Sequence, residues 1–381
     1  MNSQSMPRFA SMLEQAFLVR GHQVQMWSPK ARVHTFFPTG SLSKWAGYID
    51  QYILFPNWIR QQLKMQSDDT LFVFTDQALG PWVPLVKRRP HIVHTHDLLA
   101  LRSALGEIPE NRTVWSGRIY QRYIRHGFQK ARHFISVSNK TKDDLHLYGQ
   151  VSPLTSEVVY NGLNYPFTPI IADEARRILH QAGLPVPESG MLLHLSGYQW
   201  YKNVPGIVIL YAHYAKSQAN PLPLWLVGPV LDEKLQMALD EVPEHAEVHF
   251  FHGLNIKILQ AIYSLSRVFL FPSLAEGFGW PIIEAQACGC PVITTGEPPM
   301  NEVGGPAARY LPRLKVEDDV QLWAKNAAVV LNEVLNLEES ECVDLIKQGM
   351  DWAKRFDTDT AIDNYLLIYQ QVIEFEISKQ L

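Results

Sequence analysis

Short apolar runs alternate with longer stretches of helical periodicity along most of the chain. The short runs are rich in Val, Ile, Leu and Phe and are bounded by Gly, Pro, Asp or Ser, which is typical of buried strands. They cover residues 23–29, 70–76, 91–96, 133–138 and 158–162, and then 191–197, 223–228, 248–253, 267–273 and 291–295. Helical patterns fill the intervals, for example at 11–21, 203–218, 255–266 and 280–289. This repetition predicts an α/β protein with parallel sheets covered by helices on both faces.

The strand–helix series occurs twice, which predicts two domains. At 381 residues the chain exceeds the ~250–300 residues at which a single core stops growing. The first series ends at the turn signal Asn161-Gly162, and prolines punctuate the region that follows. We therefore expect two doubly wound, Rossmann-like domains, 1–165 and 166–355, facing each other across a cleft, and a C-terminal helix, 356–381, that packs back on the first domain. Ligands of such sheets bind at the carboxyl ends of strands, so the cleft is the expected site.

The first domain opens directly into a helical pattern at 7–21, and no apolar β-run precedes it. The first strand of its sheet is therefore expected to be missing. In a doubly wound sheet that strand is central, and its loss leaves buried backbone groups unpaired at about 1–3 kcal/mol each. We expect the natural start of the chain to lie upstream of Met1, and the first domain to be looser than the second.

Charge is divided unevenly between the two predicted domains. The net charge is -4, but residues 1–165 hold 19 Lys and Arg against 11 Asp and Glu, whereas the remainder holds 15 against 27. The first domain is therefore the one expected to face an anionic partner. Its sharpest basic segment is 115–134, where Arg118, Arg122 and Arg125 recur at helical spacing beside aromatic residues. Two interpretations stay open: an ordinary solvated helix face, or a surface that contacts an anionic membrane.

Cysteine content and hydropathy bear on where the protein works. The three cysteines, Cys288, Cys290 and Cys342, are too few for a disulfide framework and lack the partners of a zinc site. No window reaches the roughly 18 apolar residues of a spanning helix, and the N-terminus lacks the pattern of a signal peptide. We expect a reduced, cytoplasmic protein, at most peripheral to the inner face of a membrane, with no nucleic-acid partner.

Two carboxylates flank a glycine-rich corner between a predicted strand and a predicted helix. Glu276 precedes Gly277 and Gly279, and Glu284 lies in the helix that Pro281 starts. Glycines let backbone N–H groups approach a ligand, and a helix N-terminus favours an anion. A carboxylate can accept hydrogen bonds from two hydroxyl groups. Together these groups predict a site for a sugar attached to a phosphate, although either glutamate alone would be read as an ordinary surface residue.

A second loop in the same domain offers a cation. The strand at 191–197 ends at Gly197, and Lys202-Asn203 opens the next helical pattern. An ammonium group beside a helix N-terminus can hold a diphosphate. A lone Lys-Asn pair is also common in surface turns, so this loop gains its meaning from the glycine-rich corner.

With these motifs the sequence resembles the retaining glycosyltransferases of family 4, which have the GT-B fold and a Glu-x7-Glu motif matched by Glu276 and Glu284. The resemblance covers nearly the whole chain and includes residues 158–164, 197–203, 252–295, 301–311 and 363–372. It implies that Glu276 binds hydroxyls of the donor hexose, that Glu284 binds the ribose, and that Lys202, in the loop from Gly197 to Asn203, binds the diphosphate. It also implies backbone donors at Gly277, Phe278 and Gly279, and a place beside the transferred sugar for His96. An ordinary core or loop histidine is the competing interpretation of His96.

Two departures from the family pattern bear on activity. Tyr198 stands where relatives commonly have an arginine, so another cation would have to compensate at the diphosphate. The glycine-rich loop after the first strand has no match, because residues 2–6 occupy that place.

The resemblance predicts a retaining, metal-independent hexosyltransferase in cell-surface polysaccharide or glycoconjugate synthesis. Its donor would be a UDP- or GDP-sugar and its acceptor a saccharide or lipid-linked saccharide, and no cofactor is expected. The adjacent pairs Asp68-Asp69 and Asp318-Asp319 lie in polar segments and are read as surface residues rather than a metal site. Two alternatives stay open: a nucleotide-sugar epimerase of the same fold, and a non-catalytic nucleotide-sugar-binding scaffold.

Overall fold

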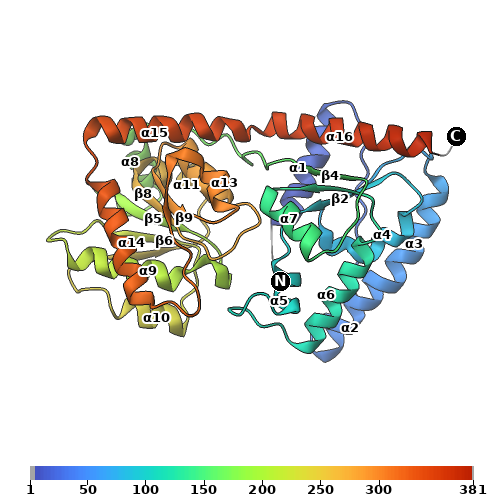
Figure 1. Ribbon diagram of the computed structural model, residues 1–381, viewed down its shortest axis with the longest axis horizontal. Helices are drawn as coiled ribbons and strands as arrows, with labels where there is room; N and C mark the ends of the chain where they lie inside the picture. The colour runs from blue at the N-terminus through green and yellow to red at the C-terminus, as the bar shows by residue number, and fades with distance from the viewer. Residues whose placement is uncertain (1–4, 380–381) are drawn as a thin grey trace.

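The computed structural model describes residues 5–379 as two parallel sheets, each with helices on both faces (Figure 1). The N-terminal sheet has the strand order β1-β2-β3-β4, and all of its pairs are parallel. Its strands are β1 (Phe72–Phe74), β2 (His91–Thr95), β3 (His133–Ser136) and β4 (Thr155–Val158). The helices around it are α1 (Ser5–Val19), α2 (Ser41–Ile49), α3 (Phe55–Gln62), α4 (Val83–Val86), α5 (Leu99–Leu105), α6 (Trp115–Phe128) and α7 (Asn139–Leu147).

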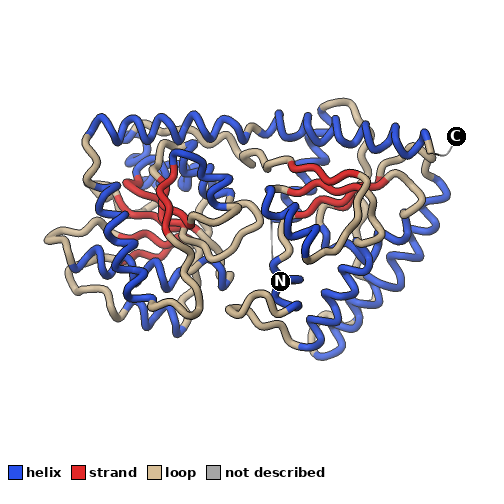
Figure 2. The backbone as a smooth tube through the Cα atoms, viewed as in Figure 1, coloured by secondary structure: helices blue, strands red, loops and turns tan. Residues whose placement is uncertain are grey.

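The C-terminal sheet has the strand order β10-β9-β8-β5-β6-β7 and is also parallel throughout; the two groups of strands are separate in Figure 2. Its strands are β5 (Met191–Leu195), β6 (Leu224–Val227), β7 (Val248–Phe251), β8 (Ser266–Phe271), β9 (Val292–Thr295) and β10 (Ala308–Leu311). Its helices are α8 (Ala172–Gln181), α9 (Val204–Lys216), α10 (Glu233–Leu239), α11 (Ile256–Leu265), α12 (Trp280–Ala287), α13 (Met300–Gly304), α14 (Val320–Leu335) and α15 (Glu339–Ala353).

The C-terminal sheet is buried on both faces, which explains its continuous apolar strands. Side chains of α8, α11 and α12 pack on one face, and those of α9 and α14 pack on the other. Trp225 of β6 and Phe269 of β8 are fully buried in the first of these two cores. The predicted α/β class and the two-sheet architecture are confirmed.

The last helix, α16 (Thr358–Ser378), returns to the N-terminal sheet, as Figure 1 shows. Its buried residues Ile362 and Tyr365 pack with Phe9 of α1 and with Ile92 of β2, so α1 and α16 cover one face of the sheet together. Helices α4 to α7 cover the opposite face. The domain boundaries at 165 and 355 stay predictions.

Two predicted strands need correction, and one strand was missed. Residues 23–29 form no strand, because Trp27 packs its ring on Trp58 and Phe72 at the side of the sheet instead of joining it. The strand expected at 158–162 ends at Val158, since the paired residues are 155–158, an edge strand whose first three residues are polar. Strand β10 was not predicted; only its first and last residues are buried, so it lacks a long apolar run.

The described part of the chain begins with α1 at Ser5, so the predicted absence of a first strand stays a prediction. The strands of the N-terminal sheet follow in chain order, so this sheet, in the described part of the chain, lacks the reversal that a doubly wound topology implies. Of residues 2–6, where the family's glycine-rich loop was predicted to have no match, positions 2–4 lie outside the described residues.

Candidate active site

The strand order of the C-terminal sheet places its binding site. From β5 the chain moves outward to β6 and β7, and then returns to β8 on the other side of β5. The loops that leave the carboxyl ends of β5 and β8 therefore diverge, and such a switch point is where open α/β sheets bind ligands. Both predicted donor loops, 196–203 and 272–279, lie there.

Lys202 and Glu276, one from each loop, form an ion pair at 2.7 Å between Nζ and Oε1. Their side chains are only 12% and 8% exposed, so the pair is largely withdrawn from water. The ammonium also lies 4.8 Å from the ring centroid of Phe271, the last residue of β8. The structure thus brings together the cation predicted for the diphosphate and the carboxylate predicted for the hexose.

Asn203 has a local structural role in this region. It is buried, has a left-handed conformation with φ 54°, and precedes the first residue of α9. Its Nδ2 donates to the carbonyl oxygen of Pro272 at 3.2 Å, which ties the β5 loop to the end of β8. Gly197 opens the same loop directly after Ser196, and Tyr198 is 74% exposed.

The glycine corner leads into α12 with its amide groups available. Gly279 has φ 104° and is the N-cap of α12, a conformation that favours glycine. Among residues 5–379, no acceptor takes a hydrogen bond from the N–H groups of Gly277, Phe278 or Gly279. The Phe278 side chain is buried in the core, so only its backbone faces the loop. These amides at a helix N-terminus could serve an anionic ligand.

Glu284 lies one turn into α12 and accepts a hydrogen bond from the hydroxyl of Tyr263 at 3.1 Å. Burial raises the pKa of its carboxyl to about 7, while the Tyr263 hydrogen bond and the charge of Arg8 oppose that rise. Arg8 belongs to α1, so the N-terminal half already acts electrostatically on this position. The carboxylate form, which a ribose diol needs as acceptor, is therefore only partly populated near neutral pH.

His96 follows β2 and meets the C-terminal half through its backbone. An added Cβ on Gly277 would overlap the His96 carbonyl oxygen, which explains the glycine. The imidazole packs edge-on against Phe9, and its Nε2 donates to the Thr75 carbonyl oxygen at 2.9 Å. Burial lowers the pKa of His96 to about 4, so the ring is neutral. The structure places His96 beside the corner, and its predicted contact with the transferred sugar stays a prediction.

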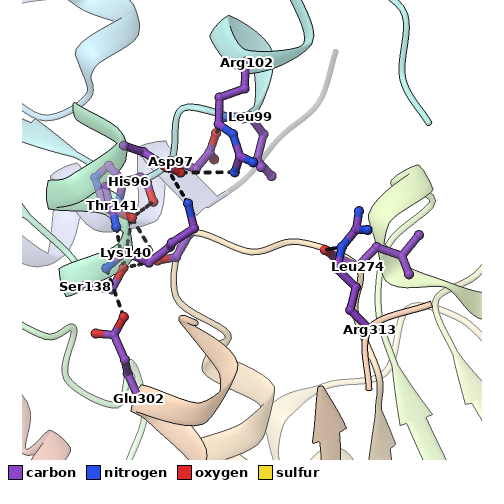
Figure 3. Close-up of polar contacts among 12 residues, drawn as sticks. His96, Asp97, Leu99, Arg102, Ser138, Lys140, Thr141, Leu274, Glu302 and Arg313 are labelled. Carbon is purple, nitrogen blue, oxygen red and sulfur yellow. Dashed lines mark hydrogen bonds and ion pairs between the residues drawn. The ribbon is translucent and has the colours of Figure 1, made fainter. Parts of the chain in front are cut away.

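The N-terminus of α7 is the element of the N-terminal half that holds the glycine corner (Figure 3). Ser138 and Thr141 donate their hydroxyl groups to the Gly277 carbonyl oxygen at 2.8 and 3.1 Å. Ser138 Oγ also accepts the Thr141 N–H, as an N-cap does. This contact was not predicted, although Ser138 after an apolar strand is a recognisable helix start.

Glu302 of α13 completes the contact from the other half. Its carboxylate accepts the backbone N–H groups of Asn139 and Lys140 at 2.8 and 2.9 Å, and the hydroxyl of Tyr160 at 3.1 Å. A carboxylate of one half thus caps a helix of the other, which the helix dipole favours. No sequence signal links residues 163 positions apart, so this residue was missed.

A cavity of about 320 Å³ lies between the two halves, with Glu276 in its wall. The N-terminal half contributes Arg102, Glu110 and Lys140, and the C-terminal half adds Trp200 and Arg313. Arg313 pairs with Glu110 at 2.5 Å across the halves. Charges of both signs line the cavity, and none of these N-terminal residues was predicted.

Within 5–379, no group of three or more His, Cys, Asp or Glu side chains could hold a metal ion. None of the helices over the same residues is both long and apolar enough to cross a membrane.

Comparison with known families agrees with this architecture. The sequence profile of "Glycosyltransferase Family 4" matches residues 6–165, and that of "Glycosyl transferases group 1" matches residues 176–339. One profile covers each half. The protein belongs to the family 4 glycosyltransferases and has their GT-B fold.

Curated relatives are distant and carry out several transfers. The chain is 23% identical over 272 residues to O-antigen chain mannosyltransferase B of Escherichia coli, covering 60% of this chain and 69% of that protein. It is 25% identical over 257 residues to the N,N'-diacetylbacillosaminyl-diphospho-undecaprenol alpha-1,3-N-acetylgalactosaminyltransferase of Campylobacter jejuni, covering 65% and 62%. The match to the latter thus spans less than two thirds of that protein's length.

Solved structures share the fold over most of the chain. WaaG, a glycosyltransferase involved in lipopolysaccharide biosynthesis, aligns with a TM-score of 0.67 at 17% identity, covering 96% of this chain and 95% of WaaG. Anabaena HepE, solved in complex with UDP and glucose, aligns with a TM-score of 0.65 at 18% identity, covering 93% and 88%.

Proposed function

We propose that this glycosyltransferase is a retaining enzyme that moves a hexose from a UDP- or GDP-sugar to a saccharide or lipid-linked acceptor. The observation that carries the proposal is the convergence of Lys202, Glu276 and the free amides of 277–279 at the switch point of the C-terminal sheet. A diphosphate needs a cation and backbone donors, and a hexose needs carboxylate acceptors. The complex of HepE with UDP and glucose supports a donor of this class.

Donor binding would exchange the partners of the Lys202–Glu276 pair. The ammonium would turn to the diphosphate and the carboxylate to the hexose hydroxyls, so that neither charge is left unpaired. Departure of the nucleoside diphosphate builds negative charge, which Lys202 and the amides of the glycine corner would stabilise without reorganisation. The proposal assigns this stabilisation to protein groups, and so it includes metal independence and needs no cofactor.

The cavity beside Glu276 is the proposed place of the acceptor. It shares Glu276 with the hexose site and is closed by the N-terminal half, so an acceptor hydroxyl there would face the reacting sugar. Its mixed charges offer both donors and acceptors, which suits the hydroxyl groups of a saccharide. The names of the O-antigen relatives support synthesis of a cell-surface polysaccharide or glycoconjugate, and we place the reaction on the cytoplasmic side.

The test uses purified protein with a panel of UDP- and GDP-hexoses. A donor present at 100 times its Kd should add about 2.7 kcal/mol to the free energy of unfolding, which is measured as a higher melting temperature. Glu276→Gln should retain the fold and lower the rate of hexose transfer roughly 10- to 150-fold, the range of a charge-assisted hydrogen bond. Lys202→Ala should lower the affinity for nucleoside diphosphates by a similar factor, and it should leave the affinity for the bare nucleoside unchanged. Equal losses for both ligands would assign Lys202 a structural role.

Further outcomes separate the alternatives. A retaining transferase gives a product with the anomeric configuration of the donor by NMR, and its rate survives EDTA. Interconversion of donor sugars without transfer would identify an epimerase. Donor binding without turnover, for every donor and saccharide tried, would favour the non-catalytic scaffold.

A further inference from the structure

The N-terminal half exposes a concentration of large apolar side chains on two helices. They lie on α2, on the π-helical turn 50–54 that continues it, and at the start of α6. We name this surface the aromatic face; its exposed members are Leu42, Trp45, Ile49, Ile53, Val114, Trp115, Ile119, Tyr120 and Tyr123. Trp45 is 67% exposed and Trp115 is 74% exposed. Single exposed apolar residues are ordinary, but a contiguous group marks an interaction surface.

Contacts between the two helices make the aromatic face one continuous surface. The hydroxyl groups of Tyr52 and Tyr120 lie 2.7 Å apart. The ring of Tyr48 stacks on Tyr120 at 6.5 Å, and Tyr52 meets Tyr123 edge-on at 5.7 Å. Figure 1 shows α2 and α6 side by side at the lower edge of the N-terminal half. The exposed tryptophans therefore project from two helices that are packed against each other.

The charge around the aromatic face is positive. Lys44, Arg112, Arg118 and Arg122 are exposed beside it, and α6 contains no acidic residue. The acidic residue of the segment 41–54 is Asp50, which is buried and accepts the backbone N–H of Val33 at 2.9 Å. Arg125, the third arginine predicted for membrane contact, is instead half-buried.

Arg125 donates to the Tyr148 carbonyl oxygen at 3.3 Å, which holds it away from the surface. Arg125 therefore belongs neither to the aromatic face nor to the cations around it. The remaining cations, Lys44, Arg112, Arg118 and Arg122, are exposed and lie within seven residues of Trp45 or Trp115 in the chain.

We propose that the aromatic face docks this protein on an anionic phospholipid bilayer. Trp and Tyr favour the depth of the lipid head groups, and Lys and Arg are attracted to anionic lipids within a Debye length. A second copy of the chain is a poorer occupant, because a symmetric contact would set these cations against their own images. The proposal rests on the proposed function in one respect: the bilayer would also hold a lipid-linked acceptor.

The aromatic face adjoins the cavity along the chain. Ile108, Pro109 and Glu110 line the cavity, and Trp115 follows Glu110 by five residues, which span at most about 18 Å. A saccharide anchored in the bilayer at Trp115 would thus lie within reach of the cavity. A short segment of chain thus joins the docking surface to the proposed acceptor site.

The test is flotation of the full chain with vesicles of phosphatidylcholine alone or with about 30% phosphatidylglycerol, an anionic lipid that attracts Lys and Arg. Wild type should bind the anionic vesicles and release at high salt. Trp45→Ser with Trp115→Ser should abolish binding, and Arg118→Gln with Arg122→Gln should weaken it roughly 30-fold. Matched controls are Leu367→Ser, exposed on α16, and Arg176→Gln with Arg177→Gln on α8, which should bind like wild type.

Two readouts keep the outcomes apart. Release of nucleoside diphosphate from a donor without vesicles should be unchanged in the face variants; its absence in wild type would defeat the proposed function and leave docking intact. The docking proposal is overturned if anionic vesicles do not bind, or if both variant pairs bind as wild type does. It is equally overturned if light scattering shows a dimer that Trp45→Ser and Trp115→Ser dissociate without any vesicle binding.

Discussion

The two sheets differ in topology and in how they contribute to the site. The C-terminal sheet has six strands and reverses direction between β5 and β8, so its strand ends create a site from a single half. Within residues 5–379, the N-terminal sheet has four strands in chain order and no reversal. Its contribution comes from a helix N-terminus at Ser138, from backbone at His96 and from an outer surface. In the proposed function, one half would offer the ligand-binding groups and the other would position them.

This division explains why the ionisable groups differ between the halves. Lys202 and Glu276 of the C-terminal half pair with each other and Glu284 accepts from Tyr263, partners that the proposed function has them exchange for a donor. Asp50 and His96 of the N-terminal half already have backbone partners. Variants at the contact between the halves should therefore separate donor binding from transfer.

The largest effect is expected from Gly277→Ala. The added Cβ overlaps the His96 carbonyl oxygen, so the halves must separate or the corner must shift. A displacement of about 1 Å at a reacting centre can cost 10²-fold. We expect transfer to fall roughly 100-fold or more, measured with saturating donor.

The same variant should still bind the nucleoside diphosphate, because Lys202 and α12 lie in the C-terminal half. Gly349→Ala is the control, since its Cβ would find its nearest neighbour at 3.5 Å. A parallel loss of nucleotide binding in Gly277→Ala would show that the corner itself collapses, and would contradict the division between the halves.

The donor loops could be placed from sequence because their signals are local. Gly277, Gly279 and Pro281 mark a strand–turn–helix junction within a few residues. Lys202 marks a second such junction, between β5 and α9. Asn203 was predicted to contact the donor; in this structure its amide donates to the Pro272 carbonyl, and the donor contact stays a prediction. The local sequence predicted the loop at 196–203, but it could not distinguish a ligand contact of Asn203 from a structural one.

Contacts between distant segments gave no such signal. The Glu302 cap on α7 and the Tyr52–Tyr120 contact depend on how whole domains and helices pack. The false strand at 23–29 has the same origin, since an apolar run can pack against the side of a sheet without pairing. The basic pattern of α6 was visible in sequence, whereas the withdrawal of Arg125 required the fold.

An intermediate effect is expected from Glu302→Gln. The amide keeps the shape but sets a donor group against one of the N–H groups of Asn139 and Lys140, and removes the charge that favours the α7 N-terminus. Looser contact should lower kcat/KM for transfer roughly 10- to 30-fold with little change in nucleotide affinity. Glu333→Gln, on the exposed side of α14, is the control. Unchanged kcat/KM would remove Glu302 from the positioning of the corner.

The smallest effect on ligand binding is expected from the protonation of Glu284, which also affects stability. Its pKa of about 7 in the folded protein exceeds the usual value of 4.5, so the folded state holds a proton that the unfolded state has lost between these values. The free energy of unfolding should therefore fall as pH rises from about 4.5 to 7, by at most about 3 kcal/mol. Glu284→Gln should be more stable than wild type at pH 8 and equal to it at pH 4.

The same titration should govern ribose binding. Between pH 6 and 8 the ionised fraction of Glu284 rises from about a tenth to nine tenths at a pKa near 7. Affinity for the bare nucleoside, which carries no titrating phosphate, should therefore rise by somewhat less than tenfold over this range. In Glu284→Gln the affinity should be independent of pH. If the nucleoside affinity of wild type does not change with pH while the expected stability difference is seen, Glu284 is a buried carboxyl with a raised pKa that does not contact the ribose. If the stability does not change with pH, the raised pKa itself is contradicted.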